Sequence, residues 1–388
     1  MSTGTLDTLL DQVDSMAGVV RDGALETERL GQLAPDVVDA LHEADLFRML
    51  VPQTLGGHGL TIPESIEIIE RVAAFDASTA WTLAILADGA IFARRVSPEA
   101  FTTICGDPRG LVAGTLNPVT ARARAVDGGY VFSGRATYLS GSAHARWILA
   151  AAIVFDGDEP VITDDGIQIR SAIFPIERAR DLATWNVTGM RGTGSNDYEF
   201  EDVEVAADWT FEPMRPSAGG TDVFSWIPLW AQLGPALTAC SVGAARNAIA
   251  RFMELASAKV PTGNFTLLAE RPPAQIALGE AQGLYQAARA VLMETAHTSW
   301  DRGVAHEPFD NAALARSRLG LVTAVRLAAQ AVDLLHDAAG MSAVARDSVL
   351  DRCWRDVHTM SQHAVLSPAR FEIAGRVLLG QDPGAPII

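Results

Sequence analysis

Cysteine is scarce in this sequence of 388 residues, and the three cysteines, Cys105, Cys240 and Cys353, lie far apart. An odd, sparse count with no CxxC spacing argues against a disulfide framework and a cysteine-based zinc site. We therefore expect no metal centre. The same pattern is typical of proteins in the reducing cytoplasm, and we expect this location.

Positive charge is also in short supply, since 30 lysines and arginines stand against 47 aspartates and glutamates, a formal net charge of −17. Nucleic acids and anionic membranes attract clustered positive charge, so the balance argues against both as partners. The polar, acidic stretch Met1–Asp14 predicts no signal peptide. The longest apolar runs, such as Trp147–Phe155, are too short to cross a bilayer.

The first part of the chain, residues 1–107, is predicted to be helical. Apolar residues recur at helical spacing over Leu30–Leu46, where a proline opens a second helix, and again over Pro63–Ala74. Asp76 begins an Asp-Ala-Ser-Thr sequence, which is typical of a helix N-cap, and a long apolar segment follows it. This part therefore predicts a helical domain.

The middle part, residues 108–215, changes to strand patterns. An Asp-Gly-Gly sequence at 127–129 predicts a hairpin turn between two of the strands. The predicted strands are Val112–Leu116, Ala121–Val126, Tyr130–Ser133, Trp147–Phe155 and Asp197–Val205. We expect a small β-domain here.

The last part, residues 216–388, returns to long helices after a predicted linker, Pro213–Gly220. The first two begin with proline, which suits the first helical position, and the third ends before Gly340, a typical C-terminal cap. The predicted helices are Pro235–Ala258, Pro273–Asp301, Asn311–Ala339, Ser348–Gln362 and Ala369–Leu379. Helices, a β-domain and then helices do not alternate as a Rossmann fold does, so the pattern indicates an α+β protein.

Four segments, taken in order, resemble the acyl-CoA dehydrogenase superfamily over essentially the whole chain. Within it, the sequence is similar to the branch of two-component flavin-dependent monooxygenases that includes dibenzothiophene monooxygenase and the hydroxyphenylacetate hydroxylase oxygenase. The segments are Leu46–Pro52 followed by Leu55–Gly57, Asp76–Trp81, Thr184–Asp197, which is the most specific, and Arg352–His363.

This resemblance implies the acyl-CoA dehydrogenase fold. An N-terminal helical domain would cover residues 1–107 and a β-barrel-like domain residues 108–215, with a C-terminal four-helix bundle over 216–388. It also implies an oxygenase that receives reduced FMN or FAD from a separate flavin reductase and reacts with O₂. A C4a-hydroperoxyflavin would then hydroxylate, or oxygenate at nitrogen or sulfur, a small apolar or aromatic substrate. A homotetramer is implied as well.

Histidine replaces a carboxylate in the last of these segments. The dehydrogenases commonly supply a glutamate base here, whereas this chain has no acidic residue between Asp356 and Glu372. The resemblance implies that His363 helps to form or protonate the hydroperoxide, work that suits an imidazole near neutral pH. The alternative is a histidine that interacts with a helix dipole. His358 lies on a different helical face at about 100° per residue, so we expect it only at the substrate pocket.

Ser140, followed by Gly141 after a predicted strand, occupies the place of a serine near the reactive edge of the flavin in the resembling enzymes. A hydroxyl can donate to a flavin nitrogen, although a turn serine that bonds its own backbone has the same sequence pattern. The resemblance also places Trp185 and Arg191 beside the flavin, in what we expect to be a strand–turn–strand. For Arg191 the alternative is a structural salt bridge.

Asn117 is a further candidate contact to the flavin pyrimidine ring, with a turn asparagine before proline as the alternative. Gly340 stands where a neighbouring subunit's backbone approaches the FAD pyrophosphate in the dehydrogenases, but the preceding glycine of that family is Ala339 here. The family's FAD-contacting arginine is also not evident in this sequence, and Lys259 lies closest to its place. These departures leave room for a diffusible reduced flavin. Predicted pocket residues for an apolar or aromatic substrate are Trp81, Trp226 and Trp230, together with His358; aromatic residues at helical spacing also occur in ordinary cores.

Two rival functions remain at this stage. An FAD-dependent acyl-CoA dehydrogenase would need a carboxylate base from another helix, for which Glu254 and Glu280 are candidates. A non-catalytic binding protein on a degenerate flavin fold would bind neither reduced nor oxidised flavin. Tightly bound FAD in the purified protein would favour the dehydrogenase, whereas Ser140, Arg191 and His363 argue against the non-catalytic binding protein.

Overall fold

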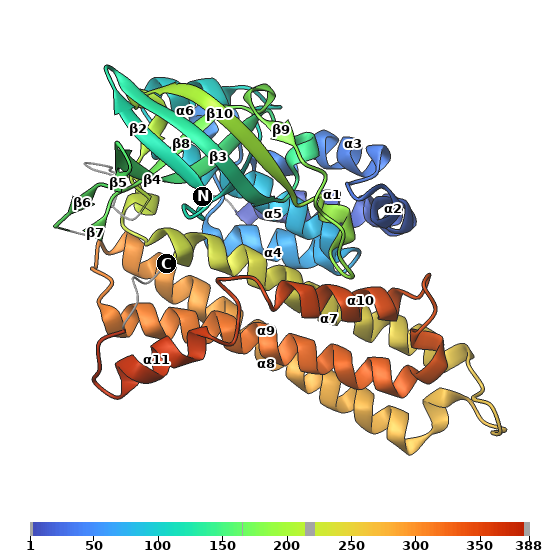
Figure 1. Ribbon diagram of the computed structural model, residues 1–388. Coiled ribbons are helices and arrows are strands. Elements are labelled where there is room, and N and C mark those ends of the chain that lie inside the picture. Colours follow the sequence, from blue (N-terminus) through green and yellow to red (C-terminus); the bar gives the residue numbers. More distant parts are fainter. Residues whose placement is uncertain (1–2, 165, 214–221, 384–388) are drawn as a thin grey trace.

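The computed structural model describes residues 3–164, 166–213 and 222–383 (Figure 1). Helices from the start of the chain and a twisted sheet form one half of the molecule, and the helices α7 to α11 form the other (Figure 1). This arrangement confirms the α+β class. The predicted linker beyond Pro213, and with it the predicted boundary at residue 215, lies outside the described residues.

The N-terminal helices begin at recognisable caps. Asp76 accepts a hydrogen bond from the backbone N–H of Thr79 at 2.8 Å, which confirms the predicted start of α5. Thr61 and Glu64 form a reciprocal capping box at the start of α4, a signal that the sequence prediction did not use. The helices are α1 (Thr3–Ser15), α2 (Ala17–Leu30), α3 (Pro35–Glu43), α4 (Ile62–Ala73), α5 (Ala77–Ala93) and α6 (Pro98–Gly106).

The main sheet has the strand order β11-β8-β4-β2-β3-β10-β9, with β1 parallel to β4 and β5 beside β4. The predicted hairpin is present, because β2 and β3 pair antiparallel around Gly128, whose φ is 76°. The longer strands are β1 (Val112–Thr115), β2 (Ala121–Val126), β3 (Gly129–Leu139), β4 (Trp147–Asp156), β8 (Ile169–Pro175) and β10 (Asn196–Ala206). The short ones are β5 (Glu159–Pro160), β9 (Arg180–Asp181) and β11 (Thr210–Phe211), and β6 (Ile162–Thr163) pairs separately with β7 (Gly166–Ile167).

The helices of the last part form an elongated bundle (Figure 1). They are α7 (Leu229–Ala258), α8 (Pro272–Val304), α9 (Asn311–Ala339), α10 (Val349–Met360) and α11 (Arg370–Leu378). The bounds of α9 are those predicted. The predicted start of α7 at Pro235 is wrong: the helix begins at Leu229, and Pro235 lies inside it, buried in the bundle. By length and composition alone α9 resembles a membrane span, but it packs along both α7 and α8.

Two hydrophobic cores organise the described residues. The smaller one lies within the sheet and includes Ile148 and Phe174. The larger one runs from α1–α5 into α7–α10, so the two helical parts of the chain share a single core. Leu149 on β4 faces this helical core while its neighbour Ile148 faces the sheet core. Strand β4 is therefore buried on both faces, as its continuous apolar run predicts.

Candidate active site

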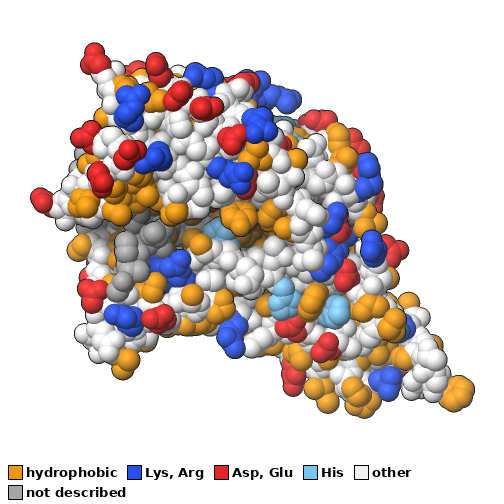
Figure 2. Space-filling model, in the orientation of Figure 1, with side chains coloured by type: hydrophobic (Ala, Val, Ile, Leu, Met, Phe, Trp, Pro, Cys, Tyr) orange, Lys and Arg blue, Asp and Glu red, His pale blue; other side chains and the backbone are white. Residues whose placement is uncertain are grey.

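The site lies where the sheet, α5 and the end of α10 meet. Figure 2 shows the surface hollowed between the sheet half and the helical bundle, with hydrophobic side chains along the hollow. Trp81 of α5 donates from its indole N–H to the Ser140 hydroxyl at 3.1 Å. The ring of Trp81 also meets the ring of His363 edge-on, with centroids 5.4 Å apart. The structure thus brings together three residues that the sequence analysis proposed separately.

Ser140 is held by a tight turn immediately after β3. The N–H of Gly141 donates to the carbonyl of Thr193 at 2.8 Å, and Gly141 has a φ of 73°. A Cβ atom at Gly141 would lie only 3.0 Å from Leu86 of α5, so the turn needs glycine for both conformation and space. The hydroxyl of Ser140 bonds Ser195 and Trp81 and makes no bond to its own turn, which disfavours the turn-serine alternative.

His363 follows α10 and is an uncharged imidazole at neutral pH. Burial, helped by the nearby charge of Arg370, lowers the pKa of His363 to about 4. Its Nδ1 accepts from the N–H of Val365 at 3.3 Å, which leaves the proton on Nε2. Within the described ranges Nε2 has no hydrogen-bond partner, so Nε2–H is available as a donor. A neutral ring has little interaction with a helix dipole, which disfavours that alternative.

The segment predicted as strand–turn–strand is mostly irregular, with a short 3₁₀ turn at Arg191–Thr193 before β10. It is held between α2, α5 and α10, and this proximity explains its glycines. A Cβ atom at Gly189 would lie 2.1 Å from the Arg355 carbonyl oxygen. Gly194 has a φ of 54° and sits against Gly31. Close approach therefore matters here as much as positive φ.

Trp185 and Tyr138 form an aromatic pair at the edge of the site. Their rings meet edge-on with centroids 6.3 Å apart, and the Trp185 indole N–H donates to the Met190 carbonyl at 3.0 Å. Tyr138 is 68% exposed and has a φ of 62°. An aromatic residue in the left-handed region is strained, and such strain is common at functional sites. The local sequence carries no signal for this conformation, so a role for Tyr138 could not be predicted from it.

Arg191 makes structural contacts. Its guanidinium lies 3.7 Å from the Glu28 carboxylate on α2 and donates to the carbonyl of Val187 at 3.3 Å. These contacts favour the salt-bridge alternative over a flavin contact.

Asn117 is exposed and shapes the turn after β1. Its side-chain oxygen accepts from the N–H of Val119 at 3.3 Å, and its amide donates to Thr137 at 3.4 Å. The turn-asparagine alternative is therefore present. Because the side chain remains exposed, a cofactor contact stays a prediction.

The structure directs His358 away from His363. The ring of His358 bonds Asp333 of α9 at 2.8 Å and packs on Trp354. His358 lies on α10 and His363 lies just beyond its end, and the two rings have different partners, as their spacing predicts. The placement of His358 in the substrate pocket gains no support. Gly340 ends α9 with a φ of 57°, and Lys259 donates to the neighbouring Ala339 carbonyl at 2.7 Å. The Lys259 side chain therefore caps the C-terminal end of α9.

Trp226 and Trp230 do not share a helical face, because α7 begins only at Leu229. Trp226 is 43% exposed and stacks on His306, with centroids 4.3 Å apart. Trp230 is buried, and the guanidinium of Arg318 lies 4.5 Å from its ring centre. Of these two tryptophans, only Trp230 has the burial expected of a residue that faces the interior.

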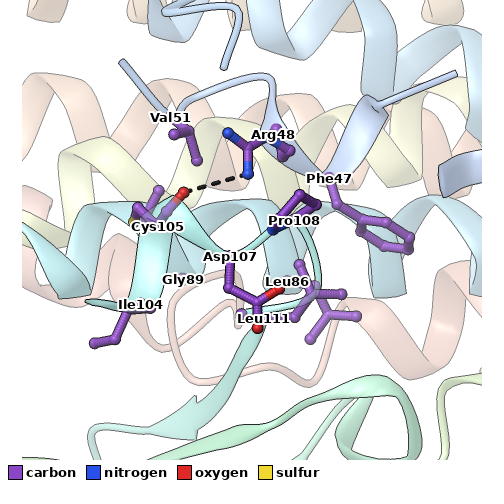
Figure 3. Close-up of a pocket in the computed structure, with 12 residues that line it drawn as sticks. Phe47, Arg48, Val51, Leu86, Gly89, Ile104, Cys105, Asp107, Pro108 and Leu111 are labelled. Carbon is purple, nitrogen blue, oxygen red and sulfur yellow. Dashed lines mark hydrogen bonds between the residues drawn. The ribbon is translucent and has the colours of Figure 1, made fainter. Parts of the chain in front are cut away.

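A small cavity beneath α5 belongs to the N-terminal signature (Figure 3). It holds about 20 Å³, room for roughly one water molecule, and is too small for a substrate. Arg48 donates to the carbonyl oxygens of Cys105 and Leu55 at 3.3 Å and 2.5 Å. The signature Leu46–Pro52 thus ties the loop after α3 to α6. Among the described residues no cluster of His, Cys, Asp or Glu could hold a metal ion.

Comparison with known proteins agrees with this architecture. Residues 7–94 match the N-terminal domain family of acyl-CoA dehydrogenases, and residues 236–368 match the C-terminal domain family. An indole-3-acetate monooxygenase of Pseudomonas putida is 30% identical over 93% of this chain and 92% of its own. The flavin-dependent monooxygenase oxygenase subunit HsaA of Mycobacterium tuberculosis is 28% identical over 98% of both chains.

Solved structures show the same fold over the full length. The HsaA monooxygenase from M. tuberculosis superposes with a TM-score of 0.89 at 26% identity, covering 99% of this chain and 100% of that one. XiaF from Streptomyces sp., solved with FADH₂ and glycerol, has a TM-score of 0.90 over 99% of this chain and 98% of its own, but at 23% identity supports the fold alone. The chain belongs to the acyl-CoA dehydrogenase superfamily, in its branch of flavin-dependent monooxygenases. It is an oxidoreductase of the kind that forms the oxygenase component of these enzymes.

Proposed function

We propose that this chain uses reduced FMN or FAD and O₂ to oxygenate a small apolar or aromatic molecule, and that a separate reductase supplies the flavin. The observation that carries the proposal is the neutral His363, packed on the same tryptophan that holds Ser140. Two relatives point the same way: indole-3-acetate monooxygenase, and an FADH₂-dependent resorcinol hydroxylase of Rhizobium sp. that is 26% identical over 97% of this chain and 95% of its own.

The residues at the site suit a reduced flavin ring. Ser140 offers a hydroxyl oxygen, His363 offers an Nε2–H donor, and the exposed Tyr138 offers an aromatic face beside Trp185. The bound flavin would supply the electrons that activate O₂. The chain's own contribution is to exclude water and to direct one donor and one acceptor at the reacting edge of the ring.

The dehydrogenase rival lacks a suitable base. Glu254 is exposed and pairs with Arg251 at 2.6 Å, and Glu280 is exposed on α8. Asp88 of α5 is a buried carboxyl, but burial raises its pKa well above the ordinary value, which favours the protonated acid over a base. Asp356 is occupied by a hydrogen bond from the Met190 N–H at 2.5 Å. None of these carboxyls serves as a free base.

We further propose a homotetramer in the cytoplasm, with domains over residues 1–107, 108–215 and 216–388. The shared helical core supports a fixed arrangement of the first and last of these. The described helices α7–α10 form an elongated bundle, and we propose that the subunits pair along it.

The experiment is a stopped-flow mixing of the protein, with photoreduced FMN or FAD under anaerobic conditions, against oxygenated buffer. We expect a transient flavin–oxygen adduct before the spectrum of oxidised flavin appears. Direct reoxidation without a transient, in a protein that retains FAD through purification, would contradict the proposal and favour the dehydrogenase.

A further inference from the structure

A row of three buried hydroxyls runs from Ser140 into the segment before β10. The oxygens of Ser140 and Ser195 lie 2.7 Å apart, and those of Ser195 and Thr193 lie 2.6 Å apart. At the far end, Thr193 donates to the carbonyl of Met190 at 2.9 Å. All three side chains are nearly inaccessible, with exposures of 6%, 3% and 2%. Hydroxyls this deeply buried are normally fully hydrogen-bonded.

The carbonyl at the end of the row sets the direction of every proton in it. A carbonyl can only accept, so the Thr193 hydrogen points to Met190. If all three contacts are hydrogen bonds, the Thr193 oxygen can only accept from Ser195, because its own hydrogen is already used. The Ser195 oxygen must then accept from Ser140. The opposite direction would forgo the bond to the carbonyl.

The backbone of Met190 is itself held in place. Its N–H donates to the buried carboxyl of Asp356 on α10 at 2.5 Å, and its φ is 57°. Its carbonyl also accepts from the Trp185 indole at 3.0 Å. The N–H and the carbonyl of Met190 belong to two different peptide groups, and a hydrogen bond holds each of them in place. The end of the row is therefore well defined.

The direction decides what Ser140 can offer. Its hydrogen is used on Ser195, and its oxygen already accepts from the Trp81 indole. One lone pair on its oxygen remains, so Ser140 can accept one more hydrogen bond. It has no further hydrogen to donate. From the sequence we expected this hydroxyl to donate to a flavin nitrogen, but its contacts favour the role of an acceptor.

We propose that Thr193 and Ser195 are positioning residues that make Ser140 an obligate acceptor and so select reduced over oxidised flavin. This inference rests on the proposed function. Reduced flavin carries a hydrogen on N5, which an acceptor can bind, whereas oxidised flavin has a bare lone pair there. Two facing acceptors repel, and a site built for one partner rejects the analogue that lacks its hydrogen. The row thus favours uptake of reduced flavin and release of the oxidised form.

The test compares Thr193→Val, which keeps the shape but removes the hydroxyl, with Thr193→Ser, which keeps the hydroxyl. Dissociation constants of photoreduced and oxidised FMN are measured anaerobically for each variant and for the unmodified protein. In Thr193→Val, Ser195 is free to donate to Ser140, and Ser140 can then donate outward. We expect the preference for reduced FMN to fall by roughly fivefold in Thr193→Val, about the worth of one hydrogen bond, and to persist in Thr193→Ser.

Ser195→Ala is the second variant, because it removes the acceptor of the Ser140 proton and should shift the preference in the same direction. Equal ratios in the unmodified protein, Thr193→Val and Ser195→Ala would overturn the inference while leaving the proposed function intact. If the unmodified protein binds neither form of FMN or FAD, the proposed function fails together with it.

Discussion

The ring of Trp81 lies edge-on to the ring of His363 at an interplanar angle of 72°, while its indole N–H donates to Ser140. One side chain of α5 thus positions residues from the sheet and from the end of α10. A change at Trp81 is therefore expected to affect both the acceptor and the donor of the site.

Trp81→Phe should separate these two effects, because it removes the N–H and keeps an aromatic ring. We expect a modest loss of stability, about 1 kcal/mol for one buried hydrogen bond, and faster release of hydrogen peroxide after reduced FMN meets oxygen. Thermal unfolding and a peroxide assay measure the two. The control is Ser140→Ala. Trp81→Phe is then made in the Ser140→Ala background. If it changes stability and peroxide release there as much as it does in the unmodified protein, the two residues act independently and are not coupled through their hydrogen bond.

His363→Gln should shorten the lifetime of the flavin–oxygen adduct by about tenfold or more, since a positioned acid–base group contributes at least that much. Stopped-flow absorbance measures the lifetime. His358→Gln is the matched control, because that ring bonds Asp333 and should leave the adduct unchanged. An equal effect of the two substitutions would contradict the assignment.

The lowered pKa of His363, about 4, has a consequence for stability. In the unfolded chain the ring has its ordinary pKa near 6.5, so the unfolded state binds the proton between these values and the folded state does not. The contribution of this residue is present above about pH 6.5 and is lost as the pH falls toward 4. Urea unfolding of His363→Gln at several pH values should show a smaller acid-side loss than the unmodified protein.

The contribution of Asp356 to stability changes with pH in the opposite direction. Burial and the nearby Asp76 raise the pKa of Asp356 from 3.8 to about 7, so the folded state binds the proton in that window. Its contribution is largest below pH 3.8 and declines as the pH rises to about 7. Asp356→Asn keeps an acceptor for the Met190 N–H and should reduce this decline in unfolding experiments. An unchanged pH profile would contradict the assigned pKa.

Gly189 should not tolerate a side chain. A Cβ atom there would lie 2.1 Å from the Arg355 carbonyl, so α10 or the segment must shift. We expect Gly189→Ala to lower the free energy of unfolding by about 1–3 kcal/mol, the usual cost of overpacking. Gly279→Ala is the control: this exposed glycine of α8 has nothing within 4 Å of its Cβ position, and alanine should stabilise the helix.

Local patterns predicted the parts of the fold that depend on local physics. The bounds of α9 followed from helical spacing and Gly340, and the cap at Asp76 followed from its residue type. Pro235 misled the prediction because the rule for proline at helix starts is only a preference, and the bundle core accommodates this one inside α7. Strand β8 was missed because it is identified by its pairing with β4, a contact between distant segments.

The site divides in the same way. His363 and Ser140 were found through family motifs, and their meeting at Trp81 followed only from the fold. Ser195 lies 55 residues from Ser140 in the chain, so no spacing rule links the two hydroxyls. The strained φ of Tyr138 depends on its surroundings, including the Asp197 carboxylate that accepts from its N–H at 3.1 Å. Long-range contacts of this kind are not encoded in a local pattern.

The core shared by the first and last helices also governs how the chain reaches its native state. During synthesis α4 and α5 emerge long before α7, their main packing partner, because the whole sheet is made in between. The apolar face of α4 is therefore exposed to solvent until the ribosome has synthesised α7 and the rest of the bundle. Contacts this distant in sequence slow folding. A nascent chain that stalls before α7 is thus expected to be bound by chaperones, whereas one released after α10 can close the core by itself.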